Sequence, residues 1–305
     1  MKKFQLLIFA ITSFILLSFT TGDNIYDPAL VEISTTTYNS DKFIMVSMKR
    51  DGGRIKAKYF AATDPNTNKT VPERFKKWTI GKNVITYSSG TYMTACDQYL
   101  SPKPVGLCID NGIIVNKSLS NDLGGLVIVY PSKGGGGIVA SRLKDGNLTV
   151  QTSSGSKIFD IKNNSFDRVQ FIKWAEDNEA TVFQAHLLAY KDKLDISICK
   201  TGTCLNPASR RFLAVCKDQN DQLVHTIVHC ITETTLYDGS YKVYKFLKDF
   251  KDMKEVVYMI NLDTGCQNVF SVYKSDGMKK SIKVSGNNDF FNIEQAVNLL
   301  VYYYE

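Results

Sequence analysis

Short stretches that either alternate between apolar and polar residues or are mainly apolar run through most of the chain. A period of two is typical of strands with one buried face, short apolar runs are consistent with buried strands, and clusters of Gly, Pro, Asn and Asp between such stretches mark turns. The stretches lie at residues 30–38, 42–50, 54–62, 83–87, 104–110, 125–131, 137–143, 180–190, 209–215, 225–230, 257–263 and 298–304. The pattern predicts an α+β fold with a mostly antiparallel or mixed β-sheet core and a few helices.

Three stretches have the spacing of helices instead. Residues 72–78 begin with a proline, which suits the first turn of a helix, and residues 165–175 and 238–250 repeat apolar positions every three or four residues. The residues expected on the buried faces are Phe166, Val169, Ile172 and Trp174 in the second helix and Tyr241, Tyr244 and Leu247 in the third.

The stretch from Val257 to Phe270 is the most informative for chemistry. An apolar strand is followed by Asn261, Leu262, Asp263, Thr264 and Gly265, so a carboxylate is delivered onto a glycine-containing turn. Such a charge lies at the edge of a sheet, where a cleft can form. The alternative interpretation of Asp263 is a carboxylate that caps the turn.

The N-terminus has two lysines, then an apolar block, then small and hydroxyl residues. This layout predicts a signal peptide over residues 1–22, with an uncleaved membrane anchor as the alternative. Residues 23–305 then form a single domain, and no other stretch is long and apolar enough to span a bilayer. We therefore expect an exported chain, periplasmic or extracellular, without a stable membrane span after cleavage.

Charge narrows the class of partner. The formal charge of +7 falls to +5 without Lys2 and Lys3, and the remaining lysines are spread along the chain. Dispersed lysines predict a solvated surface rather than a nucleic-acid groove, although a mild basic bias suits an anionic substrate.

The seven cysteines all follow the N-terminal segment. An oxidising compartment makes disulfides plausible, and Cys199 and Cys204 frame a small loop that one could close. Paired CxxC motifs do not occur, so no metal site is expected, and the stretch from His225 to Cys230 alternates like a core strand. The glycines at 134–137 are followed by another strand and therefore predict a flexible hairpin rather than a phosphate-binding loop, and the sequence identifies no particular cofactor.

The order of several motifs resembles the phosphodiester glycosidase domain family. That family has a strand ending in Asn-Ala-Gly-x-Phe/Tyr, then Pro-x-Gly-Leu and an Asn-Gly turn, a Gly-Pro strand, an Arg-led strand, a helix, and Asn-Leu-Asp-Gly-Gly-Gly-Ser. The matching segments here are Ser88–Tyr92, Pro104–Leu107, Asp110–Gly112, Gln184–Leu188, Ser209–Arg211 and Asn261–Gly265. The chain departs from the family at Ser88, at Ala185-His186 and at 264–267.

The resemblance implies a hydrolase that cleaves a sugar 1-phosphodiester bond, with a glycan or sugar phosphate as substrate. In this interpretation Asp263 serves as acid, base or nucleophile, and His186 is a second candidate for proton transfer. Residues expected to bind substrate are Ser88, Gly90, Arg210, Arg211, Asn261 and Gly265.

Three questions stay open at this point. Only one of the adjacent arginines can face the site, because neighbouring strand residues point to opposite faces. The rival to an enzyme is an exported carbohydrate-binding module that keeps the fold. For Cys266, a disulfide or buried thiol is favoured over a catalytic nucleophile, since nothing brings a histidine to it. A site requires that Ser88, Arg211 and Asp263 converge.

Overall fold

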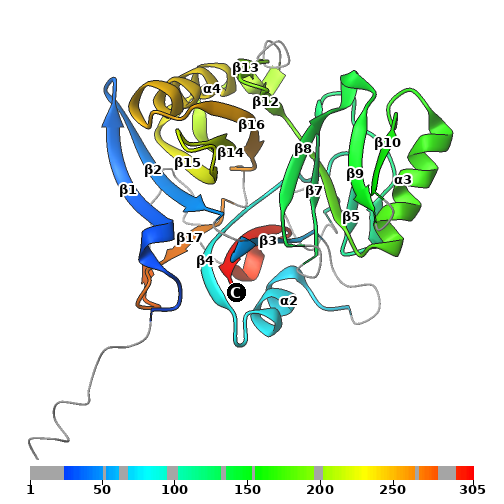
Figure 1. The fold of residues 1–305 in the computed structure, drawn as a ribbon, viewed down its shortest axis with the longest axis horizontal. Coiled ribbons are helices and arrows are strands. Elements are labelled where there is room, and N and C mark those ends of the chain that lie inside the picture. The colour runs from blue at the N-terminus through cyan, green and yellow to red at the C-terminus, as the bar shows by residue number, and fades with distance from the viewer. Residues whose placement is uncertain are drawn as a thin grey trace, which may run out of the picture.

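Antiparallel sheets account for most of the structure (Figure 1). A computed structural model of the chain describes residues 24–50, 53–61, 68–94, 102–131, 135–152, 155–195, 202–264, 268–280 and 293–305. All the strand pairs in these ranges are antiparallel, and three α-helices accompany them. The predicted α+β fold with a mostly antiparallel core is therefore confirmed.

The largest sheet has seven strands and is built around a long hairpin. Its order is β1 (Val31–Tyr38), β2 (Asp41–Lys49), β15 (Leu223–Thr234), β14 (Ala208–Lys217), β16 (Glu255–Leu262), β12 (Leu187–Tyr190) and β13 (Lys193–Leu194). Strands β14 and β15 form the hairpin, and β16 lies against the other side of β14.

Two five-stranded sheets pack beside it. One has the order β18 (Lys279–Lys280), β17 (Phe270–Tyr273), β4 (Asn83–Ser88), β19 (Leu299–Tyr304) and β3 (Ile55–Phe60). The other has the order β6 (Ile113–Asn116), β5 (Cys108–Asp110), β11 (Thr181–Ala185), β7 (Gly125–Val129) and β8 (Ile138–Arg142), and the pair β9 (Leu148–Thr152) and β10 (Gly155–Phe159) forms a separate ribbon. The C-terminal strand thus returns into a sheet, and the glycine-rich segment connects the β7–β8 hairpin, as predicted.

The three predicted helices are present as α2 (Val71–Trp78), α3 (Ser165–Asp177) and α4 (Leu236–Lys245), and α4 continues into a π-helix at Phe246–Phe250. The predicted buried faces of the second and third were partly wrong. Phe166 and Val169 are 68% and 61% exposed, whereas Phe171 and Trp174 are buried. The reason is that α3 contacts β5 and β10, so the stacked rings of Phe171 and Trp174 face that core. In α4, Tyr241 is exposed as well, and Leu236 and Val243 are buried instead.

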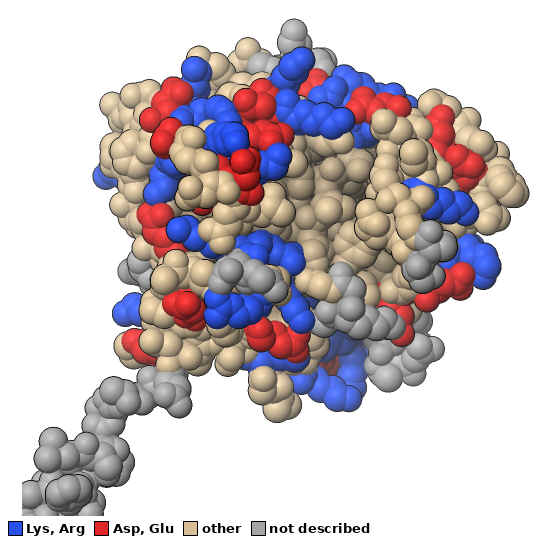
Figure 2. Space-filling model, viewed as in Figure 1, with Lys and Arg blue, Asp and Glu red and all other residues tan. Residues whose placement is uncertain are grey.

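One core joins the three large sheets. The largest cluster of buried apolar residues includes Val46 and Ile260 from the seven-stranded sheet, Tyr302 from the second sheet and Val127 from the third. The predicted strand at 180–190 passes between sheets, because it breaks at His186 into β11 and β12. Figure 2 shows this face hollowed between the lobe that carries α4 and the lobe that carries α3, with a mostly uncharged wall.

The remaining predictions concern disulfides, the signal peptide, metal sites and membrane-spanning segments. Cys108, Cys204, Cys216 and Cys230 are free thiols, and the described part of the chain has no disulfide. Cys199, the predicted partner of Cys204, lies outside the described residues, as does the predicted signal peptide. Among the residues placed by the structure, no cluster of His, Cys, Asp and Glu is suited to a metal ion. Within the same ranges no helix combines the length and the apolar character needed to cross a membrane.

Candidate functional site

Ser88, Arg211 and Asp263 converge where β4 and β16 end and β14 begins. The Arg211 Nη1 donates hydrogen bonds to Ser88 Oγ and to the Val269 carbonyl oxygen, each at 3.1 Å. The Asp263 amide donates to the Gly90 carbonyl oxygen at 2.8 Å, which ties the end of β16 to the turn after β4. Three segments that are far apart in the sequence therefore meet, as the site hypothesis requires.

Arg211 is fully buried, and the surrounding protein holds its guanidinium. Its Nη2 donates to Asn268 Oδ1, and its Cζ lies 4.5 Å from the centre of the Phe270 ring. Burial lowers the pKa of Arg211 to about 9, and the nearby Asp263 carboxylate opposes this shift. A guanidinium in this position supports the base of the site through Nη1 and Nη2, which both donate to protein groups, whereas Nε is buried and has no hydrogen-bond partner among the described residues.

Ser88 and Gly90 are buried too, and this burial disfavours their predicted contact with substrate. Ser88 Oγ donates to the Ser89 carbonyl oxygen at 2.7 Å. A Cβ atom on Gly90 would lie 2.3 Å from Tyr59 Cε2 and 3.1 Å from Asn298 Oδ1. The space beside Gly90 is filled by these two side chains rather than left open to a ligand, and the glycine is required by packing.

We expect Gly90→Ala to destabilise the fold by about 1–3 kcal/mol, because the new methyl group must displace the Tyr59 ring from a packed core. The free energy of unfolding from urea denaturation measures the effect. Gly135→Ala is the control for added bulk, since nothing lies within 4 Å of its Cβ position, although its φ of +87° adds backbone strain of its own. A Gly90→Ala variant as stable as the wild type would contradict this packing role.

His186, Asn261 and Tyr92 form a second polar group beside the first. The Asn261 amide donates to the His186 carbonyl oxygen at 3.1 Å, and Asn261 Nδ2 donates to the Tyr92 hydroxyl. The Tyr92 and His186 rings meet edge to face, with 5.3 Å between their centres. His186 Nδ1 and Asn261 Oδ1 are buried and have no hydrogen-bond partner among the described residues. Buried polar atoms are rarely left unsatisfied, so these two are candidates to bind a ligand.

The electrostatics of this group favour a neutral imidazole. Burial lowers the pKa of His186; the Asp122 carboxylate opposes the shift and the Arg210 guanidinium adds to it. Arg210 points to the face of β14 opposite Arg211, where its Nε donates to the Thr234 carbonyl oxygen at 3.2 Å. The prediction that the two arginines face opposite sides is confirmed by these contacts.

Asp263 follows directly after β16 and is close enough to Arg211 to interact with it electrostatically. Its side chain is half-buried, in contrast to the fully buried Arg211. The following residue, Thr264, donates from Oγ1 to the Ser209 carbonyl oxygen and so fixes the turn to β14. Gly265, predicted to bind substrate, and Cys266 lie outside the described residues.

The structure adds His229, for which the sequence pattern predicts only a place in the core of a strand. It lies directly opposite Arg211 in the β14–β15 pairing, and its Nε2 is 3.3 Å from Ser209 Oγ. Burial lowers the pKa of His229 well below its usual value, and Arg211 adds to the effect. No sequence signal indicated Asn268 either. The place of His229 depends on strand register and that of Asn268 on the segment before β17, and residue patterns alone determine neither.

Because buried histidines stay neutral in the folded state, we expect the stability of the protein to fall in acid. Burial lowers the pKa of His225 to about 3, below the value of about 6.5 in the unfolded chain. The unfolded state therefore binds a proton as the pH falls below about 6.5 while the folded state does not, and stability is lost over that range. We expect His225 to account for a fall of about 2 kcal/mol in the free energy of unfolding between pH 7 and pH 5.

Urea denaturation at the two pH values measures this loss. In His225→Gln the fall should be smaller by the contribution of that residue, although the variant loses the contact between His225 Nδ1 and the Tyr302 hydroxyl, which are 3.1 Å apart. An identical fall in the wild type and the variant would show that His225 does not contribute.

Comparisons with known proteins give structural likeness only. The chain matches no protein-family model and no curated protein. Among solved structures, the catalytic domain of zebrafish N-acetylglucosamine-1-phosphodiester alpha-N-acetylglucosaminidase, auto-inhibited by its pro-peptide, aligns over 93% of this chain and 87% of its own, with 16% identity and a TM-score of 0.49. A Synechocystis protein aligns over 90% of this chain and 62% of its own, with 9% identity and a TM-score of 0.47. A protein from Burkholderia pseudomallei, named as a candidate exported protein, aligns over 87% and 74%, with 7% identity and a TM-score of 0.46. Because these TM-scores lie below 0.5, the fold is described from the strand order given above and not from these alignments.

Proposed function

We propose that this chain is an exported hydrolase of the phosphodiester glycosidase type, which cleaves a sugar 1-phosphodiester such as an N-acetylglucosamine-1-phosphodiester. The observation that carries the proposal is the main-chain hydrogen bond between Asn261 and His186, made where β16 lies beside the break between β11 and β12, with Asp263 following directly after β16. A half-exposed carboxylate, a neutral imidazole and an amide with a free buried oxygen are suited to work on a sugar.

Each residue has a role in this reaction. Water replaces the phosphate at the anomeric carbon, so the products are a free sugar and a phosphomonoester. Asp263 acts as acid, base or nucleophile, and His186 is the second group that can transfer a proton. Asn261 Oδ1 accepts a hydrogen bond from a sugar hydroxyl, which satisfies its unpaired oxygen.

Arg211 has an indirect role in this proposal. Its burial and its bonds to Ser88, Val269 and Asn268 favour the positioning of the Asp263 turn over contact with the diester. The positive charge behind Asp263 then acts through the electric field, which is stronger in a buried environment than in water.

A different observation favours a second candidate, a non-catalytic exported carbohydrate-binding module. The buried bond between Ser88 and Arg211 and the close packing at Gly90 stabilise the fold whether or not any chemistry occurs. In a binding module, Tyr92 and Asn261 would contact the sugar and Asp263 would cap its turn.

One assay separates the two candidates. The purified chain, with and without residues 1–22, is incubated with UDP-N-acetylglucosamine, and the release of N-acetylglucosamine is followed. Release that depends on enzyme concentration supports the hydrolase. Absence of turnover together with saturable binding of N-acetylglucosamine oligomers would overturn it in favour of the module.

A further inference from the structure

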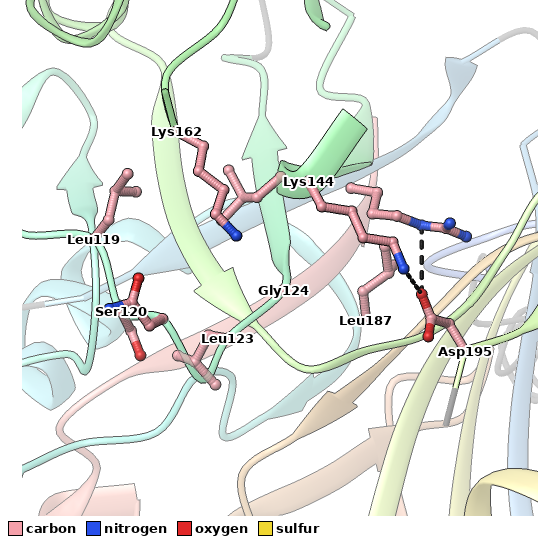
Figure 3. Close-up of a pocket in the computed structure, with 11 residues that line it drawn as sticks. Leu119, Ser120, Leu123, Gly124, Lys144, Lys162, Leu187 and Asp195 are labelled. Carbon is pink, nitrogen blue, oxygen red and sulfur yellow. Dashed lines mark hydrogen bonds and ion pairs between the residues drawn. The ribbon is translucent and has the colours of Figure 1, made fainter. Parts of the chain in front are cut away.

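A separate cavity of about 200 Å³ opens beside the loop that precedes β7 (Figure 3). Its apolar wall is formed by Leu119, Leu123, Leu143 and Leu187. Drug-sized ligands generally occupy pockets of roughly 300–1,000 Å³, so this cavity fits a smaller molecule. Polar groups come from the loop containing Ser120 and from charged residues on the other sides.

The charges of this cavity are unbalanced. Arg142, Lys144 and Lys162 line it together with one carboxylate, Asp195. Lys144 Nζ lies 3.0 Å and Arg142 Nε 3.6 Å from Asp195 Oδ2, so the carboxylate is shared by two cations. The Lys162 ammonium group has no ion pair among the described residues, and Figure 3 shows it pointing between Ser120 and Lys144. Three cations against one carboxylate leave an excess of two positive charges.

We propose that this cavity binds a small organic phosphate. The phosphate group would lie between Lys144 and Lys162, whose ammonium groups come from different segments, the turn after β8 and the segment before α3. Lysine binds phosphate as a point charge, and an excess of two positive charges matches a phosphate dianion. The leucine wall would contact the carbon part of the ligand. Nothing in this site depends on Asp263 or on the proposed hydrolysis.

Calorimetric titration tests the proposal. The purified chain is titrated with glycerol 3-phosphate, with inorganic phosphate and with glycerol. We expect saturable binding of both phosphates, tighter for glycerol 3-phosphate because of the leucine wall, and no binding of glycerol. The affinity should fall as salt is added, because partly exposed charges are screened.

Lys144 and Lys162 are exposed, so replacing both should not disturb the fold. The double variant Lys144→Gln/Lys162→Gln should bind glycerol 3-phosphate at least about tenfold more weakly, which corresponds to roughly 1.4 kcal/mol. Lys173→Gln is the matched control, because Lys173 is an exposed lysine on α3 and is not part of the cavity. Its affinity should equal that of the wild type. Thermal unfolding verifies that each variant is folded.

Two results would overturn the proposal: a folded wild type that shows no saturable binding of either phosphate, or a double variant that binds with unchanged affinity. Asp263→Asn provides the distinction from the hydrolase. That variant should retain phosphate binding in this cavity even if it, or the wild type, has no turnover.

Discussion

Replacing Asp263 by asparagine is expected to lower turnover of a sugar 1-phosphodiester by about 10²–10⁴-fold, the usual contribution of a positioned acid or base. Asparagine has the shape of aspartate but cannot accept or release the proton. The amide of residue 263 still reaches the Gly90 carbonyl oxygen, since that hydrogen bond uses the main chain. The loss should therefore appear in kcat, with KM little changed, because an interaction made in the transition state is removed.

The control for this prediction is a carboxylate that only caps a turn. Asp276 is exposed, and its Oδ1 accepts a hydrogen bond from the Met278 amide at 2.9 Å. Asp276→Asn should leave turnover unchanged. If Asp263→Asn also retained full activity, Asp263 would have the same capping role, which is the alternative that the sequence left open.

The match between sequence and structure is best where one pattern determines one element. The apolar run at 298–304 predicted a strand that returns into a sheet, and β19 lies between β4 and β3. The strand predicted at 180–190 is broken at His186, where the chain leaves one sheet for another. Adjacent Arg210 and Arg211 were expected on opposite faces, and they are.

Burial was harder to predict than secondary structure. An arginine in a strand suggests an exposed side chain, yet Arg211 is fully buried because β17 and β4 cover that face of β14. Which face is covered depends on how the sheets pack, and long-range packing leaves no periodic signal in one segment. The same reason explains α3, where Phe166 is exposed although its spacing fits a buried face.

These contacts suggest why the candidate site is built on a buried cation. Arg211 joins Ser88 of β4, Val269 before β17 and Asn268, while Asp263 is tied to Gly90 through the main chain. These hydrogen bonds hold the strand ends in one arrangement, so the turn that carries the Asp263 carboxylate is held in place. A site placed on rigid elements is held in position more accurately than one on loops alone.

Removing this cation is expected to have the largest effect on stability. Arg211→Ala should lower the free energy of unfolding by about 3–5 kcal/mol, because a large buried side chain is deleted and its partners remain unsatisfied. Ser88 Oγ, the Val269 carbonyl oxygen and Asn268 Oδ1 would each lose a donor. Urea denaturation followed by circular dichroism measures the change, and the slope of the transition verifies that unfolding remains two-state.

Two further variants separate the contributions of charge and geometry. Arg211→Lys keeps a positive charge but cannot reproduce the planar set of donors, so it should recover only part of the lost stability. Arg168→Ala is the control, because the Arg168 Nε also donates to a main-chain carbonyl oxygen, that of Ile161, but from a partly exposed position on α3. We expect that control to cost about 1 kcal/mol or less. A loss below about 1 kcal/mol for Arg211→Ala would mean that the desolvation of the buried guanidinium cancels its hydrogen bonds, and Arg211 would then not be the support of the Asp263 turn.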